Sequence, residues 1–212
     1  MAIYLDSALI DEALAAQKMG WVKGITTNPT LLAKSDLSPE VTLKRLAEIS
    51  PGVLYYQLMA ADVDGMLVEG RKAFDLIGEK TVLKIPATSV GFQVVACLST
   101  DINCAVTAIY SAAQAAVARE AGAQYAIAYV NRATRLLGDG LALVREMSAV
   151  LRGSNTEILA ASLKSPEEAA AALQAGADHL TVPLSLLQAM TTHELSEQTV
   201  EDFANNGLGI GS

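Results

Sequence analysis

One lysine, Lys84, stands inside an otherwise apolar run that extends from Thr81 to Pro86. A run this short, with β-branched residues and a closing proline, is typical of a strand buried on both faces in a parallel sheet. Burial lowers the pKa of an ammonium group and frees its amine to attack a carbonyl carbon, as Schiff-base chemistry requires. The alternative is a strand-end lysine that extends into solvent, and this stretch alone does not decide between the two.

Other polar residues stand at or near the ends of further apolar runs. They are Asp6 in the first run, Thr27 and Asn28 in the second, Gln57 in the third, Thr107 in the fifth, Tyr129 in the sixth and Ser162 in the seventh. A Schiff-base lysine needs partners for proton transfer and hydrogen bonds to hold a polyhydroxy substrate, and these side chains supply both. A polar residue at the end of a single strand is more often a helix cap than a catalytic group. Capping explains less well why so many runs end in such residues.

A cationic corner follows the sixth and seventh runs. Arg132 comes soon after Tyr129, and Lys164 comes soon after Ser162. An arginine with a hydroxyl in late-strand loops is a plausible phosphate-binding site in a barrel. Without the barrel geometry, a surface arginine in a loop would be the preferred interpretation of Arg132.

The positions of these residues depend on how the runs are arranged. Eight apolar runs are expected to form strands: Ile3–Leu5, Gly24–Thr27, Val53–Met59, Thr81–Pro86, Ile102–Ala108, Gln124–Val130, Glu157–Ala161 and His179–Val182. A stretch with helical spacing follows each of them. Eight strand–helix units in 212 residues predict a compact (β/α)₈ TIM barrel of the α/β class, whose active site lies at the carboxyl ends of the strands.

The whole chain, residues 1–212, is expected to be a single barrel domain with a short C-terminal helix near Ser196–Ala204 and a glycine-rich tail, Gly207–Ser212. No G-x-G-x-x-G motif follows the first run, which disfavours an open dinucleotide-binding sheet.

Composition excludes several classes of partner. The formal net charge of −8 argues against nucleic acid and anionic membranes. No segment is long and apolar enough to span a bilayer, and no secretory signal is visible, so we expect a cytoplasmic protein. Cys97 and Cys104 are expected to be core or near-core thiols, and His179 and His193 are too few and too far apart to suggest a metal site.

The chain resembles the transaldolase family, and within it the short fructose-6-phosphate aldolase-like branch. The matching segments are Tyr4–Asp6, Gly24–Thr30, Gln57–Ala60, Val82–Thr88, Thr107–Gln114, Tyr129–Arg132 and Ala160–Lys164. They occur in family order over most of the chain, and the Thr-Thr-Asn-Pro and Lys-Ile-Pro stretches together are specific.

The resemblance implies a class I aldolase barrel that acts on sugar phosphates and needs no cofactor or metal. Lys84 would form an imine with the C2 carbonyl of a ketose, and Asp6 would take part in proton transfer at the C4 hydroxyl. Asn28, with Thr27 beside it, would bind substrate hydroxyls. Gln57, Thr107 and Tyr129 would position a water for proton transfer, and Arg132, Ser162 and Lys164 would bind the phosphate.

Two positions divide the family, because transaldolases typically have Glu and Phe where this chain has Gln57 and Tyr129. Both match the aldolase branch, so we expect reversible cleavage of fructose 6-phosphate to dihydroxyacetone and glyceraldehyde 3-phosphate. Transfer of a dihydroxyacetone unit between sugar phosphates, the transaldolase step of the pentose phosphate pathway, is the alternative. A barrel that binds sugar phosphates without turnover is the second alternative.

The resemblance also implies a homo-oligomer, a decamer of two pentamers in the family. Two departures bear on these expectations. The glycine-rich tail replaces a longer final helix that packs on a neighbouring subunit in the family, so the number of subunits is left open. The expected loop after Arg132 carries Ala133-Thr134-Arg135, where related chains often place an acidic residue.

Overall fold

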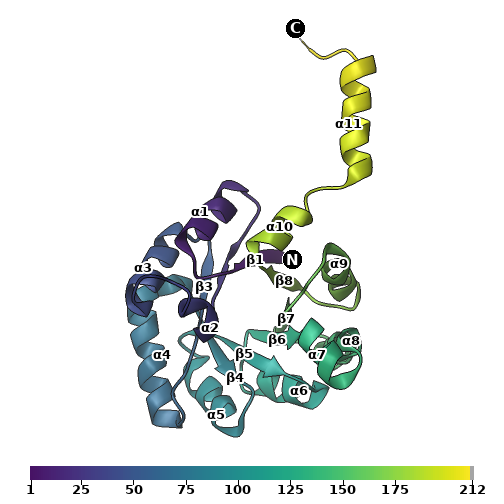
Figure 1. Cartoon of the computed structure of the whole chain (residues 1–212). Helices are drawn as coiled ribbons and strands as arrows, with labels where there is room; N and C mark the ends of the chain where they lie inside the picture. The colour runs from purple at the N-terminus through teal and green to yellow at the C-terminus, as the bar shows by residue number, and fades with distance from the viewer. Residues whose placement is uncertain (211–212) are drawn as a thin grey trace.

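The computed structural model describes residues 1–210, so Gly211 and Ser212, at the end of the expected glycine-rich tail, lie outside the described residues. Eight parallel strands close into a barrel in chain order, and helices surround it (Figure 1). The predicted (β/α)₈ barrel is therefore confirmed. Across the closing seam, β1 pairs with β8 from Ala2 opposite His179 to Leu5 opposite Val182.

The strands lie close to the predicted runs. Their bounds are β1 Ala2–Asp6, β2 Gly24–Thr26, β3 Val53–Gln57, β4 Thr81–Pro86, β5 Asn103–Ile109, β6 Tyr125–Tyr129, β7 Glu157–Ala161 and β8 His179–Val182. In β4 every residue from Thr81 to Ile85 is buried, as expected for a strand covered on both faces.

The helices follow the strands. Their bounds are α1 Ile10–Lys18, α2 Pro29–Leu32, α3 Pro39–Ile49, α4 Val63–Ile77, α5 Ser89–Leu98, α6 Ala112–Glu120, α7 Val130–Leu137, α8 Gly140–Leu151, α9 Pro166–Gln174, α10 Leu184–Ala189 and α11 Glu194–Asn206, with a 3₁₀ turn at Gly78–Lys80. The predicted start of α3 is confirmed, with Ser38 as N-cap and Pro39 at the first position. Within residues 1–210, no helix has the length and apolar character that a membrane span requires.

Buried residues form two layers. The larger one lies between strands and helices and includes Leu5, Leu83 and Val106. The smaller one contains Tyr4 and, at alternate positions along their strands, Tyr125 and Ile127 of β6 and Leu159 and Ala161 of β7. Because successive side chains of a strand point to opposite faces, one set of strands fills the barrel interior and also packs against the helices.

One sequence-based expectation is wrong: the segment after Arg132 is not a loop but the helix α7. Val130 and Ala133 are buried one helical turn apart, and Gly138, at φ 94°, ends the helix. The pattern was hidden because the apolar run of β6 continues directly into the first residue of α7, so that Val130 was assigned to the strand.

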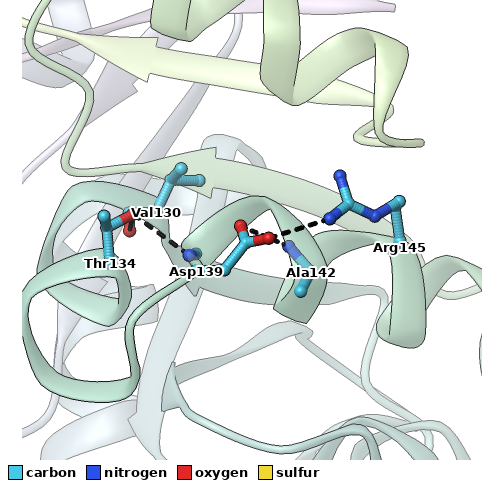
Figure 2. Close-up of polar contacts among 6 residues, drawn as sticks. Val130, Thr134, Asp139, Ala142 and Arg145 are labelled. Carbon is cyan, nitrogen blue, oxygen red and sulfur yellow. Dashed lines mark hydrogen bonds and ion pairs between the residues drawn. The ribbon is translucent and has the colours of Figure 1, made fainter.

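A polar corner holds α7 against α8 (Figure 2). The Thr134 hydroxyl donates to the Val130 carbonyl at 3.1 Å and accepts from the Gly140 amide at 3.0 Å. Asp139 caps α8 by accepting from the Ala142 amide, at 2.9 Å. A Cβ at Gly140 would lie 2.0 Å from the Val130 carbonyl oxygen, so only glycine allows this approach.

Helix α11 stands away from the barrel (Figure 1). It has no buried residue, and it leaves Val200 and Phe203 largely exposed. This helix is longer than the predicted Ser196–Ala204. Cys97 is also exposed, so the expectation that both cysteines lie in or near the core holds only for Cys104.

Candidate active site

The amine of Lys84 is enclosed by the barrel. Lys84 lies in the middle of β4 with 4% of its surface exposed, and its Nζ donates to the Thr27 carbonyl at 2.9 Å. Burial lowers the pKa of Lys84 to about 8, an effect that the nearby Asp6 carboxylate partly opposes. The side chain therefore does not extend to solvent, and a substantial fraction of the amine is neutral near physiological pH.

Asp6, the last residue of β1, is held by a chain of hydroxyl groups. Thr26 Oγ1 donates to Asp6 Oδ1 at 2.8 Å and lies 2.6 Å from Thr181 Oγ1. Burial raises the pKa of Asp6, while the charge of Lys84 and the Thr26 hydrogen bond act in the opposite direction. Asp6 and Lys84 thus shift each other toward their charged forms, and burial shifts both toward their neutral forms.

Thr107 and Tyr129 form a hydroxyl pair across β5 and β6. Thr107 Oγ1 donates to Tyr129 Oη at 3.0 Å. Beyond Thr107, Ala108 has a φ of 60°, and the pairing register shifts between Val106 and Ile109. Such a bulge is a common device near active sites, because it changes the direction of the strand.

Gln57 ends β3, and its register partner on β4 is Lys84. Among the described residues, the buried Gln57 Oε1 has no hydrogen-bond partner. An acceptor that is buried without a partner carries a desolvation cost. At a cavity wall, such an atom marks a place for a donor from a ligand or from water.

The cationic corner brings together Arg132, Ser162 and Lys164. The guanidinium carbon of Arg132, in the first turn of α7, lies 5.0 Å from the centroid of the Tyr129 ring. Ser162 follows β7 with a φ of 60°, and its carbonyl accepts from the Asn131 amide at 3.1 Å. The loop after β7 is thereby joined to the start of α7.

These groups surround one cavity of about 500 Å³ at the carboxyl ends of the strands. Its wall is formed by Asp6, Thr26, Asn28, Pro29, Thr30, Leu31, Gln57, Met59, Lys84, Ile127, Tyr129, Arg132, Leu159, Ala161, Ser162, Lys164 and Thr181. Eight of the ten candidate residues lie on this wall. The convergence expected from strand ends is therefore present in the structure.

The other two candidates, Thr27 and Thr107, lie behind the wall. The Thr27 hydroxyl is fully buried and donates to the Tyr55 carbonyl at 2.7 Å, so Thr27 offers Lys84 its carbonyl only. Thr107 is connected to the cavity wall by the hydrogen bond that it donates to Tyr129. Asn28 lies on the wall and also caps α2, because its Oδ1 accepts from the Leu31 amide.

Sequence reasoning missed Thr26 and Thr181. Both belong to the barrel interior, where Thr26 connects Asp6 to Thr181. A signal was available in the alternation of side chains, because residues two apart on a strand share a face. Thr26 stands two residues before Asn28, and Thr181 stands two residues after His179. Within residues 1–210, no cluster of His, Cys, Asp or Glu side chains is suited to holding a metal ion.

The fold and the cavity together define a (β/α)₈-barrel enzyme with a buried lysine at its active face. A family model described as Transaldolase/Fructose-6-phosphate aldolase matches residues 3–208. The chain therefore belongs to the transaldolase/fructose-6-phosphate aldolase family.

Relatives support this assignment. A probable transaldolase of Kosmotoga olearia is 34% identical over 97% of this chain and 95% of its own length. A probable transaldolase of Roseiflexus castenholzii is 36% identical over 96% of this chain and 95% of its own length.

Among solved structures, a mandelate oxidase variant with 2-hydroxy-phenylacetamide superposes with a TM-score of 0.62 at 17% identity, over 96% of this chain and 71% of that chain. A second mandelate oxidase variant gives a TM-score of 0.63 at 20% identity, over 95% of this chain and 71% of that chain. At such low identity these similarities show the barrel fold alone.

Proposed function

We propose that this enzyme reversibly cleaves fructose 6-phosphate to dihydroxyacetone and glyceraldehyde 3-phosphate through a Schiff base on Lys84. The observation that carries the proposal is the buried Lys84 amine, with its pKa lowered to about 8, on the wall of a cavity that also bears Asp6 and Tyr129. A lysine amine of lowered pKa is the usual nucleophile of aldolases that work without a metal.

The reaction begins when the neutral Lys84 amine attacks the C2 carbonyl of the open-chain ketose. Loss of water from the carbinolamine gives the imine. Asp6 then accepts the proton of the C4 hydroxyl, the C3–C4 bond breaks, and glyceraldehyde 3-phosphate leaves. The electron pair of the broken bond remains as an enamine on Lys84, so the imine nitrogen acts as the electron sink.

Protonation of the enamine at C3 and hydrolysis of the imine release dihydroxyacetone. In this proposal Tyr129, Thr107 and Gln57 hold the water that delivers the proton. The unpartnered Gln57 Oε1 supports a water at this place, and so does the Thr107–Tyr129 hydroxyl pair. A phenol can donate a proton, whereas a phenylalanine at position 129 could not.

Substrate binding is proposed to use the same wall. Asn28 binds hydroxyl groups, while Arg132, Ser162 and Lys164 bind the phosphate. Thr27 acts only through the carbonyl that it offers to Lys84, because its hydroxyl is buried behind the wall. Arginine provides several donors for phosphate oxygens, and the first turn of a helix, where Arg132 lies, carries a partial positive charge.

Dihydroxyacetone transfer is the second candidate, and the names of the relatives favour it: the Kosmotoga and Roseiflexus proteins are both probable transaldolases. One assay separates the two reactions. Release of free dihydroxyacetone from fructose 6-phosphate is compared with formation of sedoheptulose 7-phosphate after erythrose 4-phosphate is added. Transfer that is much faster than release would make the enzyme a transaldolase.

The proposed intermediate is tested by chemical trapping. Borohydride is added during turnover with fructose 6-phosphate, and the modified peptide is identified by mass spectrometry. The adduct is expected on Lys84 and not on the exposed Lys164, and the Lys84→Met variant should remain unlabelled. An unmodified Lys84 during turnover would overturn the mechanism. Thermal stabilisation by fructose 6-phosphate with neither turnover nor adduct would instead indicate a silent binding protein.

We also propose that the protein is a homo-oligomer, as the family resemblance implies. Helix α11 supports this proposal because its apolar residues Leu195, Val200 and Phe203 are 64–70% exposed. Light scattering on the full chain is expected to give a mass of several subunits, and Phe203→Glu should lower it. The decamer of two pentamers and the cytoplasmic location stay predictions.

A further inference from the structure

Glu168 lies in the first turn of α9 but does not complete the cap that its sequence position suggests. The spacing Ser165-x-x-Glu168 is that of a capping box, in which the glutamate accepts from the backbone amide of the N-cap residue. The serine half is present, since the Glu168 amide donates to Ser165 Oγ at 3.2 Å. The carboxylate, however, reaches two other donors.

These donors belong to the two segments that carry the cationic corner. Glu168 Oε2 accepts from the Lys164 amide at 2.6 Å, in the loop after β7. Glu168 Oε1 accepts from Asn131 Nδ2 at 3.2 Å, in the first turn of α7 next to Arg132. One carboxylate thereby connects the backbone of Lys164 to the helix that bears Arg132.

A second connection runs in parallel, because the Asn131 amide donates to the Ser162 carbonyl. Asn131 therefore contacts the loop directly through its backbone, and its side chain reaches the loop through the carboxylate of Glu168 in α9. Neither Glu168 nor Asn131 is on the cavity wall, whereas Arg132, Ser162 and Lys164 are. The bridge thus fixes the spacing of the wall residues from behind.

We propose that Glu168 is a positioning residue for the phosphate-binding corner and thereby increases specificity for phosphorylated substrates. The proposal rests on the proposed function, because it takes the corner of Arg132, Ser162 and Lys164 as the phosphate site. Arg132 and Lys164 are exposed, and long exposed side chains lose conformational entropy when a ligand orders them. A bridge that fixes the backbones of Arg132 and Lys164 reduces the conformational freedom of these side chains before the ligand binds, so less entropy is lost on binding.

Charge and positioning predict opposite signs when the carboxylate is removed. By charge alone, a carboxylate near a phosphate weakens anion binding, so Glu168→Ala would tighten it. If the bridge positions the corner, the same change weakens it. Charge-assisted hydrogen bonds of this kind contribute enough for about a tenfold loss of affinity.

The test compares two aldol additions of dihydroxyacetone in the synthesis direction, one to glyceraldehyde 3-phosphate and one to unphosphorylated glyceraldehyde. For Glu168→Ala we expect the KM for glyceraldehyde 3-phosphate to rise about tenfold. The rate with glyceraldehyde should change less than about twofold, because that substrate has no phosphate to place. The matched control is Glu167→Ala, which removes the exposed neighbouring acid of the same helix turn and should alter neither reaction.

Conservative variants separate positioning from loss of a helix cap. In Glu168→Gln the amide oxygen can still accept from Lys164, and a rotated Asn131 side chain can accept from the new amide group, so most of the phosphate affinity should return. Asn131→Asp alone sets two carboxylates against each other and should raise the KM. Combining it with Glu168→Gln restores a donor–acceptor pair and should lower the KM again. A residue that only stabilised α9 would show no such dependence on position 131.

Binding of inorganic phosphate, measured by calorimetry with wild type and Glu168→Ala, separates failure of this proposal from failure of the proposed reaction. Weaker phosphate binding by the variant supports the bridge even if no sugar phosphate is cleaved. Equal or tighter binding overturns it, as does an equal loss with both aldehydes. If wild type binds neither phosphate nor sugar phosphates, the corner is no phosphate site and both proposals fail.

Discussion

The barrel interior is filled differently on the two sides of Lys84. The lower half lies toward the amino ends of the strands, and the upper half lies toward their carboxyl ends, where the cavity is. Below, tyrosine rings from β1, β3 and β6 pack on one another, at centroid distances of 5.5 Å for Tyr4–Tyr55 and 5.6 Å for Tyr55–Tyr125, and the rings of Tyr4 and Tyr125 also pack against His179. Above, the same three strands supply Asp6, Gln57 and Tyr129 to the cavity wall. Each strand thus places an aromatic residue in the interior and a polar side chain farther along the same face.

The lower half is closed by packed rings and by polar contacts of His179. His179 Nδ1 accepts from the Ala2 amide at 2.9 Å, and its Nε2 lies 3.0 Å from Glu157. Burial raises the pKa of Tyr4 to about 12, so its phenol stays neutral. The buried Tyr55 hydroxyl lies near the phenol groups of Tyr4 and Tyr125, but among the described residues it forms no hydrogen bond of good geometry.

Both halves therefore contain a buried polar atom without a partner, with different consequences. Gln57 Oε1 belongs to a residue on the wall of an open cavity, where a ligand or water can donate to it. The Tyr55 hydroxyl lies among aromatic rings, where the packing of the ring outweighs the unpaired group. The comparison indicates that the upper half leaves a polar cavity open for a ligand, whereas the lower half is filled by packed aromatic rings that support it.

The largest effect is expected for Lys84→Met. Without the amine no imine forms, so turnover of fructose 6-phosphate should fall by at least about 10⁴-fold. Circular dichroism should still show a folded barrel, because the lower half is unchanged. Turnover within tenfold of wild type would remove Lys84 from the chemistry.

Tyr129→Phe should have the next largest effect. It deletes the hydroxyl that accepts from Thr107 and, in the proposed mechanism, serves proton delivery, so aldolase turnover is expected to fall by roughly 10²-fold. The measurement is the rate of dihydroxyacetone release. A matching rise in transfer to erythrose 4-phosphate would show that the trapped enamine survives longer, whereas an unchanged release rate would contradict the role.

The pH dependence should reveal the environment of Lys84. Since its pKa is lowered to about 8, the neutral fraction, and with it the rate, should rise about tenfold per pH unit below 8 and level off above it. The addition of dihydroxyacetone to unphosphorylated glyceraldehyde avoids titration of a phosphate. Asp6 favours the ammonium form, so Asp6→Asn should move the midpoint to lower pH. A rate that still rises at pH 10 would indicate an unperturbed lysine.

Tyr55→Phe, in the lower half, should have the smallest effect. It removes only an unpartnered buried hydroxyl, so turnover should stay within about twofold and the free energy of unfolding should be equal or slightly higher. Urea unfolding and the standard assay measure both. A large loss of activity would mean that the lower half takes part in the chemistry and would undo the comparison.

Local patterns were sufficient for much of this protein. Lys84 was expected in a strand buried on both faces, and β4 is such a strand. Ser38 and Pro39 were expected to begin a helix, and they do. These predictions succeeded because caps and apolar runs depend on residues close in sequence.

Other features of the structure were predicted wrongly or could not be predicted, because they depend on contacts between distant segments. Helix α7 was hidden because the apolar run of β6 continues into Val130, and its close contact with Gly140 of α8 is not visible in the local pattern. Thr181 lies 155 residues from Thr26, and no local pattern indicates that they meet. Glu168 has the spacing of a local cap but forms its bridge to a different helix.

The sequence by itself determined the eight strand–helix units, the single lysine in the fourth strand and the resemblance to one enzyme family. It could do so because spacing and residue type act over a few residues. Only the tertiary structure decided that Thr27 offers its carbonyl, that Thr26 joins Asp6 to Thr181 and that Glu168 connects the two parts of the cationic corner. Those contacts depend on barrel closure, which brings distant segments to hydrogen-bonding distance.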